Sequence, residues 1–189
     1  MNLRQTVIDR ARVEGDLLKV DDFLNHRVEP NVIAEVAAAF AHLFADGEPD
    51  LILTAEASGI PPALATGLEM SLPVVYAKKY LGPGDRYSYT REVHSPTKGT
   101  EYRVEVARRA LDAGTRVIII DDFLAGGRTA EALGQIAEEA GCVVLAFGFV
   151  LEKTFTGGRE RLEANGWNVE SLLMVDAIGQ GSFDLRAAQ

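Results

Sequence analysis

The chain has 189 residues, with 19 basic and 28 acidic side chains and a formal net charge of −9. This length suits one domain with a substantial core, and the acidic balance disfavours non-specific binding to nucleic acid. The single cysteine, Cys142, excludes an internal disulfide and fits a reducing compartment. The N-terminus lacks the apolar core of a signal peptide, and no run approaches the roughly 20 apolar residues of a membrane span. We therefore expect a cytoplasmic protein without a membrane or nucleic-acid partner.

The N-terminal quarter of the chain combines helical patterns with short apolar patches. Residues 2–14 mix apolar and charged positions in a helical manner before a glycine, which predicts a short helix. Apolar patches follow at 17–20 and 23–26, separated by two aspartates. We interpret these patches as a flap rather than as core. Pro30 then begins a strong helix that is predicted to end near Gly47.

Beyond this region, short apolar strands alternate with helical stretches. Strands are predicted at 51–54, 74–77, 116–120, 143–151 and 169–175. Helices are predicted at about 61–70, 129–140 and 158–164. Nearly all-apolar strands separated by helices are typical of a parallel sheet covered on both faces. The predicted fold class is therefore α/β, with a doubly wound, mainly parallel sheet.

One long connection interrupts this alternation. Between Lys79 and Glu101 the chain carries three glycines and two prolines among tyrosines, threonines and charged residues. A connection of this length inside a compact domain is usually functional or disordered. We predict a flexible loop at about residues 80–101.

The most informative segment is 116–130. A buried strand ends in Asp121 and Asp122, and a small-residue loop leads into a helix. Gly126 and Gly127 allow backbone N–H groups to approach an anion closely, and the following helix directs its positive dipole end to the same point. Carboxylates at the carboxyl end of a strand can accept hydrogen bonds from sugar hydroxyls. A tight turn with two solvated aspartates is the structural alternative.

This segment resembles the phosphoribosyl pyrophosphate (PRPP) signature of type I phosphoribosyltransferases. The resemblance implies that Asp121 and Asp122 hold the ribose hydroxyls, one of them through magnesium. The residues that it implies as a cradle for the 5′-phosphate are Ala125, Gly126, Gly127, Arg128 and Thr129. Many relatives carry threonine or asparagine in place of Gly126, so one side-chain donor to phosphate is missing here. Arg128 either replaces that donor electrostatically or points to solvent.

Two upstream segments resemble other parts of the PRPP site of this family. Residues 51–61 combine a strand, a small-residue turn and a helix start, as in the family's pyrophosphate loop. The donors to the leaving group would be Ala57, Ser58 and Gly59. Lys78 and Lys79 end the next predicted strand, where the family uses a basic residue for substrate phosphates. A plain turn and a solvated strand end are the alternatives, and the predicted flexible loop takes the place of the segment that closes over PRPP.

Two further segments resemble the branch of the family that acts on xanthine. In that branch an N-terminal segment ending in phenylalanine, leucine, asparagine and histidine forms a hood over the base, which corresponds to residues 17–26 here. A glutamate-lysine-aromatic group lies at the far edge of the base, which corresponds to 152–155. The base-binding residues that the resemblance implies are Leu18, Asn25, Lys153 and Phe155. Two ordinary apolar loops with charged residues facing water are the alternative.

The family elements span about residues 16–156 and imply a single domain over 1–189, with the hood at about 1–28. They imply a purine-salvage enzyme that joins xanthine to the ribose of PRPP and releases pyrophosphate, with magnesium bound to PRPP. Relatives are commonly dimers, so a homodimer is expected. Hypoxanthine, guanine or adenine as the base stays open, as does a PRPP-sensing regulator of the same fold. No cluster of histidine, cysteine and aspartate has metal-site spacing, and no dinucleotide-binding glycine fingerprint occurs.

Overall fold

The computed structural model describes residues 2–80, 87–95 and 100–188. A small hairpin consists of β1 (Arg12–Glu14) and β2 (Leu17–Lys19), followed by the π-helical turn η1 (Asp21–Asn25). The other strands are β3 (Leu51–Ala55), β4 (Val74–Tyr80), β5 (Ser88–Ser95), β6 (Thr100–Ala107), β7 (Arg116–Leu124), β8 (Val143–Lys153), β9 (Val169–Gly179) and β10 (Ser182–Ala187). The α-helices are α1 (Leu3–Arg10), α2 (Pro30–Phe44), α3 (Ile60–Met70), α4 (Arg128–Glu139) and α5 (Gly158–Glu163). Turns of 3-10 helix are η2 (Ala45–Gly47), η3 (Arg108–Ala110) and η4 (Thr154–Thr156).

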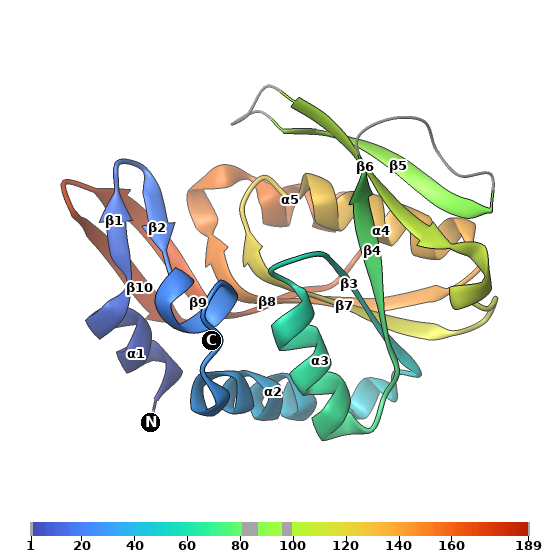
Figure 1. Ribbon diagram of the computed structural model, residues 1–189, viewed down its shortest axis with the longest axis horizontal. Helices are drawn as coiled ribbons and strands as arrows, with labels where there is room; N and C mark the ends of the chain where they lie inside the picture. The colour runs from blue at the N-terminus through green and yellow to red at the C-terminus, as the bar shows by residue number, and fades with distance from the viewer. Residues whose placement is uncertain (1, 81–86, 96–99, 189) are drawn as a thin grey trace.

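One eight-stranded sheet forms the centre of the molecule, with strand order β10-β9-β8-β7-β3-β4-β6-β5 (Figure 1). Strands β9, β8, β7, β3 and β4 run parallel to one another. Antiparallel strands extend both edges, β10 beside β9 and the pair β6 and β5 beside β4. The predicted doubly wound, mainly parallel α/β fold is therefore confirmed.

Residues of the central strands alternate between two hydrophobic cores, because successive side chains of a strand point to opposite faces. In β7, Val117 and Ile119 pack in the core beneath α4 and α5, whereas Ile118 and Ile120 pack in the core beneath α2 and α3. Figure 1 shows these two helix pairs on opposite faces of the sheet. Burial on both faces explains the near-continuous apolar runs of the sequence. Among the described residues, no helix is long and apolar enough to cross a membrane.

The predicted N-terminal helix over residues 2–14 is too long. Helix α1 ends at Arg10, and residues 12–19 form the antiparallel hairpin β1–β2. Gly15 lies in the turn with φ of +60°, a conformation that glycine adopts at little cost. Strands of three residues are too short for a period of two to be distinguished from a helical period. The hood predicted at about 1–28 thus contains α1, the hairpin β1–β2 and η1.

The long connection predicted to be irregular contains regular structure. Strands β5 and β6 pair antiparallel from Ser88 and Ala107 to Ser95 and Thr100, and β6 also pairs with β4. The irregular assignment is therefore wrong for 88–95. All five glycines and prolines that suggested it fall in 81–86 and 96–99, which lie outside the described residues. The flexibility of the loop at about 80–101 stays a prediction.

Candidate active site

The candidate site lies at the carboxyl ends of β3 and β7, which are neighbours in the middle of the sheet. From β3 the chain passes through α3 to β4 on one side, and from β7 it passes through α4 to β8 on the other. Loops that leave neighbouring strands in opposite directions open a crevice between them, and this switch point is the usual ligand site of open α/β sheets. The two turns selected from the sequence, 56–59 and 125–127, are these two loops.

The acid pair lies in the last part of β7, and its two members face different parts of the crevice. Asp122 is 6% exposed, and its Oδ2 accepts a hydrogen bond from Asn25 Nδ2 of the hood at 2.7 Å. Its Oδ1 accepts a hydrogen bond from the backbone N–H of Phe123 at 2.9 Å. Asp121 instead lines a cavity on the α4 side together with Thr129. The structure thus joins the hood to the acid pair through Asn25.

The electrostatics of the two acids are coupled. The pKa of the Asp121 carboxyl is raised well above its ordinary value, first by removal from solvent and then by the negative charge of Asp122. The positive charge of Lys79 acts in the opposite direction on this pKa. A cation or a hydrogen-bond donor that enters the crevice would therefore relieve a repulsion that already exists between the two carboxylates.

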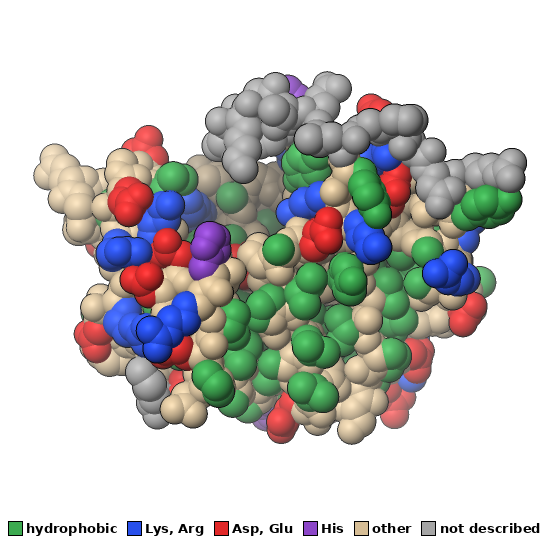
Figure 2. All heavy atoms as spheres, viewed as in Figure 1, with side chains coloured by type: hydrophobic (Ala, Val, Ile, Leu, Met, Phe, Trp, Pro, Cys, Tyr) green, Lys and Arg blue, Asp and Glu red, His purple; other side chains and the backbone are tan. Residues whose placement is uncertain are grey.

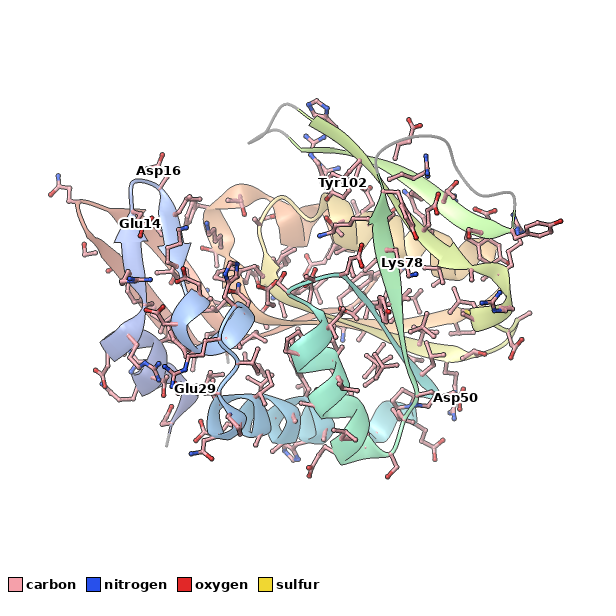
Figure 3. The ribbon with its side chains drawn as sticks, in the orientation of Figure 1. Glu14, Asp16, Glu29, Asp50, Lys78 and Tyr102 are labelled. Atoms are coloured by element: carbon pink, nitrogen blue, oxygen red, sulfur yellow. The ribbon has the colours of Figure 1, made fainter. Side chains whose placement is uncertain are left out.

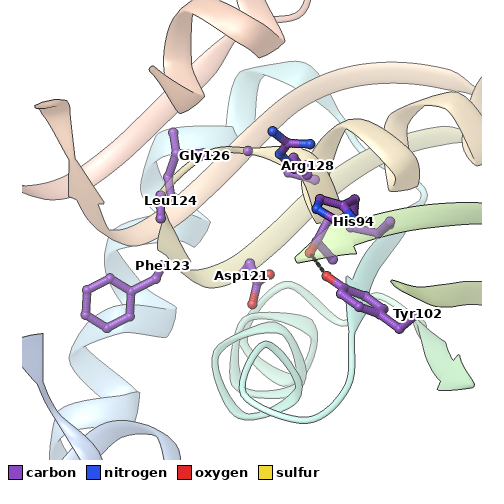
Figure 4. Close-up of a pocket in the computed structure, with 12 residues that line it drawn as sticks. His94, Tyr102, Asp121, Phe123, Leu124, Gly126 and Arg128 are labelled. Carbon is purple, nitrogen blue, oxygen red and sulfur yellow. Dashed lines mark hydrogen bonds between the residues drawn. The ribbon is translucent and has the colours of Figure 1, made fainter. Parts of the chain in front are cut away.

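The loop after β7 has the geometry of an anion site. Gly127 has φ of +71° and directly precedes α4, which begins at Arg128, one residue earlier than predicted. The first N–H groups of a helix have no acceptor within the helix, and they point toward its N-terminal end together with the positive end of its dipole. A cavity of about 230 Å³ lies over this loop (Figure 4). Its lining includes Ala125, Gly126, Gly127, Arg128 and Thr129, the residues predicted to hold a phosphate.

Helix α5 supports this loop from outside the cavity. Arg161 Nε donates to the carbonyl oxygen of Gly126 at 2.8 Å, and its Nη1 donates to Glu131 Oε2 at 3.0 Å. Gly158 packs so closely on the carbonyl of Ala125 that a Cβ at position 158 would overlap it. The sequence carries no local signal for these contacts, because Arg161 lies 35 residues after Gly126 and meets it only in the folded chain.

Side chains from β5 and β6 form the opposite wall of the cavity (Figure 4). The Tyr102 hydroxyl lies 2.7 Å from Thr129 Oγ1, and either oxygen can be the donor. Val93 and His94 line the same cavity. No sequence pattern marks these residues, because only the pairing of β6 with β4 brings them to the loop after β7.

The turn after β3 packs directly on the acid pair. A Cβ at Gly59 would lie 2.6 Å from Asp121 Oδ1 and would also overlap Thr54 Oγ1. Thr54 is completely buried, and among the described residues its hydroxyl has no hydrogen-bond partner. The peptide bond between Glu56 and Ala57 is cis. The structure therefore brings the predicted pyrophosphate turn, which also contains Ser58, to the acid pair.

The two lysines of β4 separate. Both lie within the strand rather than after it, and successive side chains of a strand point to opposite faces. Lys79 acts electrostatically on Asp121, and its Nζ lies 5.6 Å from the ring centroid of Tyr102. Lys78 lines a different hollow with Tyr76 and Tyr80. The structure thus brings Lys79 to the predicted site but not Lys78.

The predicted base-binding residues surround the end of β8 and the hood. Lys153 Nζ lies 5.9 Å from the ring centroid of Phe123, which sequence analysis did not select. Burial lowers the pKa of Lys153, and Asp16 at the tip of the hood hairpin opposes this shift (Figure 3). The tip of the hood and the end of β8 are therefore close enough to interact. Leu18 is buried in the hood, whereas Phe155 on η4 is 53% exposed.

A buried ion pair fixes the end of β8 one residue before Lys153. Glu152 is 2% exposed, and Arg159 donates to both of its carboxylate oxygens, from Nε at 2.9 Å and from Nη2 at 2.6 Å. Ser171 Oγ donates to the same carboxylate at 2.5 Å. A bidentate, fully hydrogen-bonded pair of this kind is geometrically specific. Sequence analysis recognised the glutamate-lysine-aromatic group but not the arginine that holds it.

Comparisons with known proteins agree with this geometry. The protein-family model of the phosphoribosyl transferase domain matches residues 21–173, which include the hood helix η1, both turns and the end of β8. A xanthine phosphoribosyltransferase of Chloroflexus aurantiacus is 44% identical over 180 residues, which are 95% of this chain and 85% of that protein. One of Pseudomonas entomophila is 42% identical over 181 residues, 95% of each chain.

Solved structures of other proteins share the fold of this chain. An adenine phosphoribosyltransferase of Rhodothermus marinus has a TM-score of 0.76 at 23% sequence identity, over 91% of this chain and 98% of that chain. Identity at this level supports the fold alone. In the described part of the chain, no group of three or more histidine, cysteine, aspartate or glutamate side chains is arranged to hold a metal ion. From the domain match and the similarity to curated relatives, we conclude that the chain belongs to the phosphoribosyltransferase family.

Proposed function

We propose that this chain is a purine-salvage enzyme that converts xanthine and PRPP to xanthosine 5′-monophosphate and pyrophosphate. The observation that carries the proposal is the crevice between β3 and β7, where an acid pair, an open helix N-terminus and Lys79 surround space for a phosphorylated sugar. The names of the curated relatives at 42–44% identity support xanthine as the base.

PRPP would lie across the switch point. The N–H groups at the start of α4 and the Thr129 hydroxyl would hold the 5′-phosphate. Asp121 and Asp122 would accept hydrogen bonds from the ribose hydroxyls. The turn 57–59 and Lys79 would bind the pyrophosphate, for which a compact ammonium charge is suited. Lys78 is left out of this arrangement, because it lies on the other face of β4.

The chemistry requires positioning rather than a protein nucleophile. The bond between ribose C1 and the pyrophosphate oxygen breaks, and the pyrophosphate leaves with the bonding electrons. A purine nitrogen then attacks the oxocarbenium-like C1, forms the new C–N bond and releases its proton. The chain contributes by holding sugar, leaving group and base in line, and by placing carboxylates beside the positive sugar and cations beside the departing anion.

Magnesium fits the residues present at this edge of the sheet. Carboxylate oxygens are hard ligands, and Mg²⁺ is typically bound through one or two carboxylates together with substrate phosphates. Asp121 and Asp122 offer such oxygens, and because the charge of Asp122 raises the pKa of Asp121, a cation bound at this edge would favour the ionised acids. Bound with PRPP, magnesium would neutralise charge on the departing pyrophosphate.

Base recognition would take place between the hood and the end of β8. The Lys153 ammonium has donors only, so it suits the 6-oxo oxygen of xanthine and mismatches the 6-amino group of adenine. Phe155 would stack on the purine ring. The 2-oxo group would be read by Asn25 and by the backbone around Leu18. Because Asn25 also donates to Asp122, removing it should harm all bases somewhat and xanthine most.

The decisive experiment offers the purified protein PRPP and magnesium with each of xanthine, hypoxanthine, guanine and adenine separately, and measures the nucleotide formed. We expect the highest kcat/KM for xanthine and the lowest for adenine. A higher value for another base would reassign the substrate within the family. PRPP binding without turnover of any base would favour the sensor alternative.

We also propose that the enzyme is a homodimer and cytoplasmic. Apolar side chains gather over α3 and β4 (Figure 2) and are unusually exposed, at 50% for Leu64, 76% for Leu68 and 45% for Tyr76. A patch of this kind marks an interaction surface. The buried free thiol of Cys142 suits a reducing compartment. Sedimentation should give a dimer for the wild type and a monomer for Leu68→Glu.

A further inference from the structure

Tyr102 belongs to the wall that faces the phosphate loop across the cavity. Its hydroxyl oxygen lies 2.7 Å from Thr129 Oγ1, and both side chains line the cavity (Figure 4). Its ring has Lys79 on one side, with Nζ 5.6 Å from the ring centroid. Tyr102 therefore contacts two elements of the proposed PRPP site, although it lies on a third.

The direction of the hydrogen bond between the two hydroxyls depends on what enters the cavity. Each hydroxyl carries one proton to donate and two positions to accept. A phosphate dianion can only accept, so Thr129 must turn its proton to the phosphate when one binds. Tyr102 then donates to Thr129, and the chain runs from Tyr102 through Thr129 to the phosphate. Hydrogen bonds in such a chain polarise and strengthen one another.

Because Gly126 has no side chain, the loop depends more strongly on the Thr129 hydroxyl as a donor to phosphate, and so on the hydrogen bond from Tyr102 that orients it. A Cβ at Gly126 would meet nothing within 4 Å, so the space that a side-chain donor would use is open. Arg128 lines the cavity but is exposed. Thr129 is thus the one hydroxyl of the loop 125–129 that lines the cavity, and its orientation decides how well it can donate.

We infer that Tyr102 is a positioning residue for phosphate binding, which orients the Thr129 hydroxyl so that its proton points to the phosphate. The ligand class is a phosphate monoester carried on a sugar. The inference rests on the proposed function, in that the phosphate is taken to be the 5′-phosphate of PRPP. It goes further because it assigns a role to a side chain of β6, outside both substrate loops.

The experiment uses a double-mutant cycle of Tyr102→Phe and Thr129→Val, with Tyr89→Phe as the matched control. Each tyrosine variant loses one hydroxyl and keeps its ring. Tyr89 lies on the neighbouring strand β5 with the guanidinium of Arg108 4.3 Å from its ring centroid, and it does not line the cavity. Affinity for ribose 5-phosphate is measured by calorimetry, and kcat and KM are measured with PRPP and xanthine. Thermal unfolding is recorded for every variant.

We expect Tyr102→Phe to weaken ribose 5-phosphate binding and to raise the KM for PRPP roughly three- to tenfold, the effect of one hydrogen bond in a network. The kcat at saturating PRPP and the KM for xanthine should change little. Thr129→Val should have a larger effect on affinity, and adding Tyr102→Phe to it should change nothing further, because the two act as a unit. Tyr89→Phe should behave as the wild type.

Two results would overturn the inference. One is unchanged ribose 5-phosphate affinity in Tyr102→Phe, and the other is an additive effect of the two changes, which would mean that Tyr102 does not act through Thr129. Ribose 5-phosphate carries neither leaving group nor base, so its binding is independent of turnover. If the wild type bound ribose 5-phosphate more tightly than Tyr102→Phe but converted no purine, the proposed function would be refuted and this inference supported.

Discussion

The turns after β3 and β7 share one plan of buried strand, small residues and helix start, yet their glycines serve opposite purposes. At Gly59 a Cβ would lie 2.6 Å from Asp121 Oδ1 and 3.0 Å from the carbonyl oxygen of Ala55. At Gly126 a Cβ would meet nothing within 4 Å. The first turn is packed against the acid pair, whereas the second leaves its inner side open to a cavity of about 230 Å³.

This difference separates two requirements that look alike in sequence. A glycine can be required because neighbouring atoms leave no room for a side chain, or it can leave space that a ligand fills. In the loop after β7 the steric requirement falls on Gly127. Its φ of +71° and its contact with Gly158 would make any other residue at this position strained. Gly59 is therefore required by packing against the acid pair, whereas Gly126 leaves open space beside the cavity.

The largest effect is expected for Gly59→Ala. The added methyl must displace Thr54 and Asp121, so the free energy of unfolding should fall by about 1–3 kcal/mol. Displacement of the acid should reduce kcat/KM by more than about 10²-fold. Denaturant unfolding and steady-state kinetics measure both quantities. Near wild-type values would show that the turn after β3 is as open as the one after β7.

The next effect is expected for the acid pair itself. Asp122→Asn keeps one acceptor oxygen, for the backbone N–H of Phe123, and its new NH2 group can donate to Asn25 once the Asn25 amide turns over. The fold should therefore persist, but the lost charge should lower kcat/KM for PRPP about 10²-fold. Asp121→Asn is the companion variant on the cavity side. If both variants turned over PRPP like the wild type, the assignment of this crevice to PRPP would be wrong.

A smaller effect is expected on the base side, and it depends on pH. Lys153→Ala should raise the KM for xanthine and hypoxanthine alike, by roughly tenfold, which corresponds to a loss of about 1.4 kcal/mol. Lysine donates as an ammonium, and burial lowers its pKa. The wild type should therefore lose base affinity as pH rises through this lowered pKa. The loss should occur at a lower pH than the titration of an exposed lysine would give.

The control for this pH dependence is Lys153→Arg, because arginine stays charged at all these pH values. Ionisation of the purine is common to both proteins and cancels in the ratio of their KM values. The ratio of wild-type to variant KM should rise with pH. A ratio that is constant across the alkaline range would mean that the charge of Lys153 does not bind the base.

The smallest effect is expected for Gly126→Ala, the counterpart of Gly59→Ala. The position has room for a methyl, and its φ lies outside the positive range, so unfolding free energy should stay constant or rise by up to about 1 kcal/mol. We expect kcat/KM for PRPP within about threefold of the wild type. A tenfold loss would show that the phosphate needs the backbone at this point without any side chain.

Predictions from the sequence were most accurate where periodicity was strong. The parallel strands and the helices between them were found within a few residues, because burial on both faces leaves long apolar runs. Strand β1 was included in the predicted helix 2–14, and β2 was interpreted only as an apolar patch, because each strand has three residues. The edge strand β10 was not predicted, since most of its residues are exposed and its composition carries little signal.

In the candidate site, both turns and the acid pair could be selected from the sequence because they lie in a local pattern of strand, small residues and helix. Lys153 was selected from the resemblance to the family's glutamate-lysine-aromatic group. The sequence did not separate Lys78 from Lys79, because the two lysines were placed after the strand rather than in it. It also assigned Asn25 only to the base, whereas the structure joins its amide to Asp122, 97 residues away.

The sequence by itself therefore determined the fold class, the family resemblance and the order of the two loops that follow β3 and β7, since these depend on local composition and period. Tertiary structure alone decided which side chains support those loops. Tyr102 meets Thr129 through the pairing of β4 with β6, and Arg161 meets Gly126 through the packing of α5. Such contacts depend on how distant elements pack, and no local pattern of residues records that arrangement.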